Sequence, residues 1–125
     1  MSIYNEFLSK LNTNTLQEVC EALHDEIIQY PNIKIKEKFK LPFFYGTTWI
    51  CYLNFVKKKE IEFLFVRGRE LPSKELLNFK DRVMIGGLTY KHKEEIDYGI
   101  LKLLLEEAIT LDAEKPYTFT KKKKP

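Results

Sequence analysis

The stretch KLPFFYGTTWICYLNF, residues 40–55, decides the fold of this chain. It places six aromatic residues in sixteen positions around a Tyr-Gly-Thr-Thr turn. After the turn, large apolar residues recur at every second position, at Trp49, Cys51, Leu53 and Phe55, which is the pattern of a strand with one buried face. The stretch therefore predicts a turn and a strand, with Phe43, Trp49 and Phe55 expected in the core, and it raises the question of whether its tyrosines form a binding surface.

Lysine alternates with apolar residues in the segment that leads into this stretch. The apolar positions are Ile33, Ile35, Phe39 and Leu41, and the positions between and beside them carry Lys34, Lys36, Lys38 and Lys40. This period of two is typical of a strand with one face in water, near a sheet edge. Downstream, residues 57–60 predict a tight turn before a third strand with Ile61, Phe63 and Phe65 on its inner face. Strands joined in order by tight turns predict an antiparallel meander.

Helices are predicted on both sides of the strands. The first begins behind Thr13 or Asn14, either of which can cap it, and ends at the Tyr-Pro-Asn sequence of residues 30–32. The last covers residues 94–111, with acidic residues at its start and so many leucines that deep burial is expected. A further helical turn is predicted at residues 3–11.

The segment between the third strand and the last helix carries glycine and proline. Gly68 and Pro72 indicate a loop, and Ser73 can cap a short helix through Phe79. Residues 82–90 predict another strand, in which the adjacent Gly86 and Gly87 indicate a bulge or a close backbone approach. The elements together predict the α+β class, with a single antiparallel sheet flanked by an N-terminal and a C-terminal helix.

Length and charge are typical of one domain. The chain has 125 residues and a formal net charge of +3, and we expect one domain over residues 1–120 and a disordered lysine-rich tail at 121–125. Without the four lysines of that tail, acidic residues outnumber basic ones by one. We therefore rank nucleic acid last among the possible partners. We also expect no membrane association and a cytoplasmic location, since no targeting or spanning segment is recognised.

The sequence carries no catalytic motif that stands by itself. Cys20 and Cys51 lie in apolar segments and lack the spacing of a zinc site or a disulfide framework. His24 and His92 have polar surroundings without the context of an activated nucleophile. We therefore expect a non-enzymatic protein.

The first candidate site is a stripe of carboxylates on the first long helix. Glu18, Glu21 and Asp25 follow one another at about one helical turn and so share its polar face. Carboxylate oxygens are the ligands that hard cations prefer. A solvated acidic face of an amphipathic helix has the same pattern, so both interpretations stand.

The second candidate site combines aromatic and basic residues at one end of the sheet. Tyr45 and Tyr52 fall in the turn or opposite the inward positions, and each hydroxyl group needs a partner or water. With Arg67, Arg69 and Tyr90, they could line a pocket that has aromatic walls and a polar mouth. An ordinary solvent-facing sheet surface would have the same composition.

Three segments give the chain a resemblance to a known family. They are EKFKLPFFYGTTWICYL at residues 37–53, IEFLFVRGRELP at 61–72 and LTYKHKEEIDYGILKLLLEEA at 88–108. In this order they resemble the YdhG-like domains of unknown function, over roughly residues 12–111. The resemblance implies a small α+β fold similar to that of frataxin. It also implies an intracellular iron-chaperone role, which some members have been given by analogy with frataxin.

In frataxins the iron surface is an acidic ridge on the first helix and the edge of the first strand. Carried over to this chain, the helix half would be Glu18, Glu21 and Asp25. The strand half is missing, because the first strand carries lysines whose charge would weaken a nearby cation site.

Three hypotheses about function follow. The chain is an iron-binding carrier, or it binds an unknown small ligand or protein through its aromatic sheet. Ranked last, it binds nucleic acid through the basic strand and tail. A monomer or a weak homodimer is expected in each case.

Overall fold

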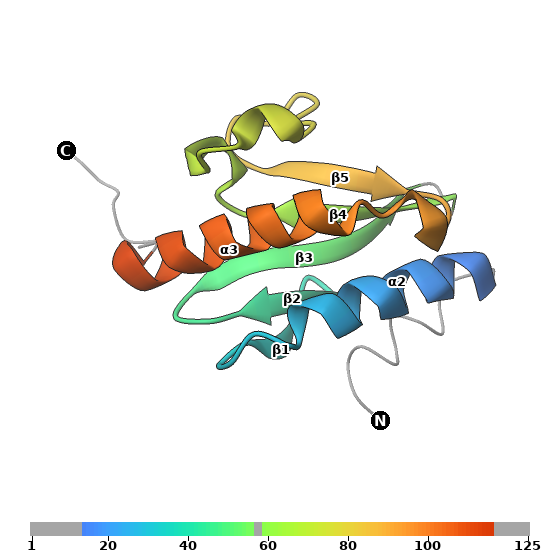
Figure 1. The fold of residues 1–125 in the computed structure, drawn as a ribbon, viewed down its shortest axis with the longest axis horizontal. Coiled ribbons are helices and arrows are strands. Elements are labelled where there is room, and N and C mark those ends of the chain that lie inside the picture. Colours follow the sequence, from blue (N-terminus) through green and yellow to red (C-terminus); the bar gives the residue numbers. More distant parts are fainter. Residues whose placement is uncertain (1–13, 57–58, 117–125) are drawn as a thin grey trace.

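The computed structural model describes residues 14–56 and 59–116. In the sequence, one α-helix precedes the five strands and another follows them, and three short 3₁₀ helices lie in the connections (Figure 1). The bounds are α2 Asn14–Ile27, β1 Lys34–Lys38, β2 Leu41–Tyr45, β3 Trp49–Val56, β4 Glu60–Phe65, η1 Gly68–Glu70, η2 Lys74–Leu76, β5 Gly86–Tyr90, η3 Lys93–Glu95 and α3 Tyr98–Glu114. The predicted helical turn at 3–11, the domain end at 120 and the tail at 121–125 lie outside the described residues.

The five strands form one antiparallel sheet in the order β1-β2-β3-β4-β5. Every strand pairs with its neighbour in the sequence, so the predicted meander and the α+β class are confirmed. Both α-helices pack on the same face of this sheet (Figure 1). Neither α2 nor α3 covers the opposite face, which leaves the two faces of the sheet in different surroundings. In the described residues, neither helix has both the length and the apolar character that a membrane crossing requires.

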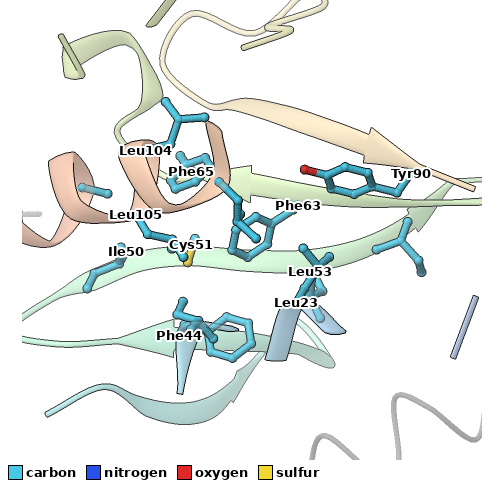
Figure 2. Close-up of a cluster of buried hydrophobic side chains, with 14 of the residues drawn as sticks. Leu23, Phe44, Ile50, Cys51, Leu53, Phe63, Phe65, Tyr90, Leu104 and Leu105 are labelled. Atoms are coloured by element: carbon cyan, nitrogen blue, oxygen red, sulfur yellow. The ribbon is translucent and has the colours of Figure 1, made fainter. Parts of the chain in front are cut away.

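The core lies between the sheet and the two helices. Figure 2 shows Cys51 and Phe65 of the central strands close to Leu104 and Leu105 of α3, whereas Phe44 lies on the side of α2. The apolar stripe of α2 joins the same cluster through Leu16, Val19, Cys20, Leu23 and Ile27. A fully buried leucine or phenylalanine contributes about 1.5–3 kcal/mol, so this cluster supplies most of the stabilisation.

The predicted first strand is in fact two strands. β1 ends at Lys38 and β2 begins at Leu41, so that only Phe39 and Lys40 lie between them. Both residues have left-handed backbones, with φ of 57° and 62°, as a type I′ hairpin turn requires. The prediction of one strand through Leu41 is wrong because the alternation of lysine and apolar residues runs on through the turn without a glycine or asparagine. The predicted edge position of β1 is confirmed.

The last helix begins later than predicted and is less buried. Asp97 accepts a hydrogen bond from the Ile100 N–H at 3.1 Å and caps α3, whereas the acidic residues before it lie in η3. One side of α3 is buried against the sheet, but Leu103 is 44% exposed. The expected deep burial is wrong, since the leucine run is wider than the surface that the sheet offers.

The connection between β4 and β5 also differs from the prediction. Ser73 does not cap a helix through Phe79, because its hydroxyl group donates to Glu107 Oε2 at 2.7 Å and its N–H donates to Oε1 at 3.0 Å. Of the helix predicted after Ser73, only residues 74–76 are helical, and β5 starts at Gly86 rather than at residue 82. The Ser73 contacts tie this connection to α3.

Asp112 of α3 holds the turn between β2 and β3. Its Oδ2 atom accepts the N–H of Thr47 at 2.7 Å, and its Oδ1 atom accepts the N–H of Thr48 at 2.8 Å and the Thr48 hydroxyl at 2.5 Å. The side chain is 6% exposed. Because three donors converge on one buried carboxylate, the end of α3 fixes the position from which β3 starts.

The predicted close approach at the two glycines is confirmed. A Cβ atom at Gly87 would lie 2.8 Å from the carbonyl oxygen of Phe63, and one at Gly86 would lie 2.7 Å from the ring of Phe79. Neither glycine has a positive φ. The requirement is therefore space between β4 and β5 and not an unusual backbone conformation.

We expect Gly87→Ala to lower the free energy of unfolding by about 1–3 kcal/mol, because the added methyl group meets backbone that cannot move aside. Gly99→Ala is the matched control, since its Cβ would meet only Asp97 Oδ1 at 3.4 Å and alanine favours the helix. Urea unfolding of both variants checks this. Equal stabilities would contradict the close packing of β5 on β4.

Candidate functional site

The sheet face that α2 and α3 leave uncovered carries a cluster of aromatic rings. Phe43 stacks on Tyr52 with ring centroids 4.3 Å apart and planes inclined by 10°. Trp49 meets Phe43 edge-on at 5.5 Å and lies 4.9 Å from Tyr45. Phe39 lies 6.4 Å from Phe43. We call these five residues the aromatic face.

The alternation of side chains along β2 and β3 creates the aromatic face. Phe43 and Phe44 are adjacent and therefore point to opposite sides of the sheet. Phe44 joins the core under the helices, whereas Phe43 pairs with Tyr52 on the other side. The predicted core position of Phe43 is wrong in this sense: the side chain is 5% exposed, but neighbouring rings bury it on the face opposite the core.

Trp49 also lies on the side opposite to the predicted one. The pairing of β2 with β3 is irregular between Phe44 and Tyr45, and consecutive residues Ile50 and Cys51 both join the core. This irregularity shifts the alternation by one residue. Trp49 therefore packs against Tyr45 on the aromatic face instead of entering the core as expected.

Lysine ammonium groups of β1 lie over these rings. The Nζ atom of Lys36 is 4.4 Å from the ring centroid of Tyr45. The Nζ atom of Lys38 is 5.1 Å from the ring of Trp49 and 5.2 Å from that of Phe39. Such cation–π contacts hold the charges beside the aromatic surface. The lysines that the sequence assigned to a solvated strand face are thus part of the aromatic face's surroundings.

A groove of about 220 Å³ opens on the aromatic face. It is lined by Lys38, Phe39, Leu41, Phe43, Trp49, Tyr52, Val66 and Ile85. Apart from the Lys38 ammonium and the Tyr52 hydroxyl, the lining side chains are apolar or carry a single indole N–H. The groove therefore suits an apolar or flat group whose charge lies at its rim.

Phe39 forms one wall of this groove, although its apolar side chain is exposed to solvent and its backbone conformation is strained. It is 78% exposed, and both it and Lys40 have a left-handed backbone, which costs L-residues other than glycine about 1–2 kcal/mol each. Sequence reasoning missed this residue because it placed Phe39 inside a strand. The signal that could have found it is a large apolar residue followed by lysine where a two-residue turn normally has asparagine and glycine.

A buried acid borders the aromatic face on the side of β4. Glu62 is 3% exposed, and its Oε2 atom lies 2.9 Å from Arg82 Nη2 and 3.2 Å from Lys80 Nζ. Tyr52 lies near this group: burial raises the pKa of its hydroxyl, the Arg82 charge lowers it and the Glu62 charge raises it. Since Glu62 is paired with two cations, Lys80 and Arg82, the net charge of this group of three side chains is positive.

The five residues predicted to line one pocket do not come together. Tyr45 and Tyr52 both belong to the aromatic face. Arg67 instead binds Glu70 through two nitrogens at 2.9 and 3.0 Å and donates to the carbonyl oxygen of Lys115, which caps the end of α3. These contacts place Arg67 at the end of α3 and not with the two tyrosines.

Arg69 and Tyr90 are held by contacts with other parts of the protein. The Arg69 guanidinium lies 3.7 Å from the ring centroid of Phe79, and its Nε atom donates to the Val83 carbonyl at 2.9 Å. Tyr90 is 6% exposed and faces the core beneath the helices (Figure 2). Burial is the main cause that raises the pKa of its hydroxyl, with a smaller effect from Asp97. Their predicted pocket with Tyr45 and Tyr52 is therefore not formed.

Glu18, Glu21 and Asp25 lie on the exposed side of α2, as predicted. The Asp25 Oδ1 atom lies 3.5 Å from His24 Nδ1. Within the described residues, no group of three or more histidine, cysteine, aspartate or glutamate side chains is arranged to hold a metal ion. The lysines of β1 flank the aromatic face, whereas α2 packs on the opposite one. Iron binding at these carboxylates stays a prediction.

The two cysteines are placed as small buried side chains. Burial, with a smaller effect from Glu21, raises the pKa of the Cys20 thiol to about 12. Burial alone raises the pKa of the Cys51 thiol well above its usual range. Because a cysteine nucleophile acts as the thiolate, neither thiol has the environment of a reactive cysteine.

The chain matches no protein-family model, and comparisons with curated proteins and with solved structures give no match either. The resemblance to the YdhG-like domains therefore stays a prediction, and the candidate site rests on the geometry of this chain.

Replacing the turn residues by Phe39→Asn with Lys40→Gly should raise the free energy of unfolding by about 1–2 kcal/mol, because both new residues tolerate the left-handed backbone. Asn32→Gly is the control, since Asn32 has φ of 71° and asparagine already tolerates it. Thermal unfolding compares the three proteins. Loss of stability in the double variant would show that Phe39 is retained for packing.

Proposed function

We propose that this chain is a non-enzymatic binding module whose aromatic face takes an anionic partner that carries a flat or apolar group. The observation that carries the proposal is the groove of apolar side chains with lysine at its rim. Ligand sites commonly combine aromatic walls with a small number of charged groups that orient the ligand.

Exposure of large apolar side chains supports the proposal. Phe39 is 78% exposed at one side of the groove, and Val83, two residues before the lining residue Ile85, is 81% exposed. The exposed ring of Phe39 adjoins the apolar groove, and contiguous exposed apolar surface on a folded protein marks interaction sites. In Phe39 the exposure coincides with a left-handed backbone, and strain of this kind is often retained where a side chain serves binding.

The charged side chains at the borders of the groove indicate that the partner is anionic. Lys36 and Lys38 hold ammonium groups over the rings, and Arg82 and Lys80 lie at the opposite border with a single carboxylate between them. A cationic border attracts anions and repels other cations. A second copy that docked face to face would bring the same lysines together, so a partner of opposite charge fits better.

The surroundings of the possible nucleophiles support a non-enzymatic role. Both cysteine thiols are buried and held protonated by their surroundings. His24 lies next to Asp25 on α2, across the sheet from the groove, and His92 is an exposed residue before η3. Neither imidazole belongs to the groove lining.

Anilinonaphthalene sulfonate, which combines fused rings with a fixed negative charge, is a direct probe of this proposal. We expect the native protein to bind it with increased dye fluorescence and with energy transfer from Trp49. Phe39→Ala should weaken binding about tenfold, as loss of a buried ring contact predicts. Lys38→Glu should weaken it further through like-charge repulsion.

Two variants on other surfaces are matched controls. Leu103→Ala removes a large exposed apolar residue from α3, and Lys93→Glu reverses an exposed charge in η3. Both should bind the dye as the unchanged protein does. Equal affinity of all five proteins would sink the proposal, because the dye would then bind elsewhere.

A further inference from the structure

The two edge strands of the sheet differ in their backbone hydrogen-bond partners. At the β5 edge, Asn78 forms a bridge with Gly87, in which each N–H donates to the other carbonyl at 2.9 Å. At the other edge, β1 pairs with β2 alone among the described residues. Successive residues of a strand direct their backbone groups alternately to its two sides, so half of those of β1 point away from β2.

A ladder of lysines runs along the β1 edge. Lys34, Lys36 and Lys38 are alternate residues, so their side chains emerge on one face at intervals of about 6.6 Å. Lys36 and Lys38 lie over rings of the aromatic face, which shows that this face is the one they share. Backbone groups suited to strand pairing and a regular row of positive charges therefore lie along the same edge.

We propose that an extended acidic segment of a partner protein adds to the sheet along β1, with its carboxylates opposite the lysine ladder and a large apolar side chain in the groove. This inference rests on the proposed function of the aromatic face and names its partner. Addition of a peptide strand to an open sheet edge supplies affinity through the main chain and specificity through alternate side chains.

Charge selects an acidic segment over a second copy of this chain. Opposite charges on directly facing residues of paired strands attract, whereas like charges repel. Pairing of β1 with β1 of another copy would bring lysine ladders together on the shared face. Lysine on an edge strand thus prevents self-association, and the same lysines favour a strand that carries glutamate or aspartate at alternate positions.

The position of the groove selects an apolar side chain within that segment. The groove begins at Lys38 and Phe39, where β1 ends, and continues across β2 and β3. A side chain near the end of an added strand is close enough to enter it. A nucleic-acid base would bring donors and acceptors that need partners, and of the lining side chains only Lys38, Tyr52 and Trp49 carry a hydrogen-bonding group.

The test uses a nine-residue peptide that alternates glutamate and valine and begins and ends at a glutamate position, with phenylalanine in place of one terminal glutamate so that its ring lies on the same face as the carboxylates; this is about the length of an ordinary strand. Its binding to the whole chain is followed by the emission of Trp49, the single tryptophan. We expect saturable binding that Lys36→Glu with Lys38→Glu weakens at least about tenfold. Lys93→Glu, the control, should leave the affinity unchanged.

A second peptide separates edge addition from charge attraction without changing the protein. It has the same sequence with N-methyl groups on the alternate residues whose N–H groups would face β1, which removes the donors of that edge while every charge remains. We expect it to bind at least about tenfold more weakly than the first peptide. Equal binding of the two peptides would overturn edge addition and leave the proposed function of the aromatic face intact.

Other results of these binding experiments would distinguish a failure of edge addition from a failure of the proposed function, and would identify a different occupant of the surface. Failure of the peptide in a protein that still binds anilinonaphthalene sulfonate would overturn the inference alone, whereas failure of both would overturn the proposed function as well. Tighter binding of oligothymidylate than of the peptide would assign the surface to nucleic acid. A dimer that sediments without peptide and is lost on Lys36→Glu with Lys38→Glu would assign the edge to a second copy.

Discussion

The alternation of side chains along β2 and β3 is the constraint on which the rest of the structure depends. Phe44 and Cys51 point into the core, and Phe43 and Tyr52 point to the other side. A slip of one residue would exchange these two sets and place the wrong rings under the helices. The same alternation that builds the core therefore builds the aromatic face, and neither can change without the other.

The end of α3 makes this register secure. The Asp112 carboxylate accepts hydrogen bonds from Thr47 and Thr48 in the turn between β2 and β3, immediately before Trp49. Arg67 satisfies the carbonyl of Lys115 at the end of the same helix. A helix that covers one face of the sheet thus determines where a tryptophan emerges on the other. The helix side supports the aromatic face through these polar contacts and through the core.

Regular patterns in the sequence predicted the fold well, and local irregularities limited the prediction of the site. The meander, both α-helices and the close approach at Gly87 follow from periodicity and from glycine position. The turn at Phe39 lacks the residues that mark such turns, so its strain and exposure could not be inferred. The side on which Trp49 lies depends on an irregular pairing that has no sequence signal.

Long-range partners explain the remaining misassignments. Arg67 looks like a ligand-binding cation in sequence, but its position is determined by Glu70 and by the end of a helix far away in the chain. Tyr90 follows the strand alternation into the core, and only the packing of the helices reveals on which side the core lies. Sequence periodicity identifies two faces of a strand without saying which one is covered.

The aromatic face combines features that a fold alone does not require. Its turn has two strained residues, the ring of Phe39 is largely exposed, and lysines are held over the rings of Tyr45 and Trp49. Stability alone would favour a turn of asparagine and glycine and a polar surface. A partner that covers the rings and neutralises the lysines would explain this departure.

The most direct measurement is a side-chain NMR comparison of the protein with and without anilinonaphthalene sulfonate. We expect the ring signals of Phe39 and Trp49 and the methyl signals of Ile85 to shift together with one affinity, while the methyl signals of Leu103 on α3 stay in place. Shifts centred on α3, with Phe39 and Trp49 unchanged, would contradict the claim that the aromatic face is the binding surface.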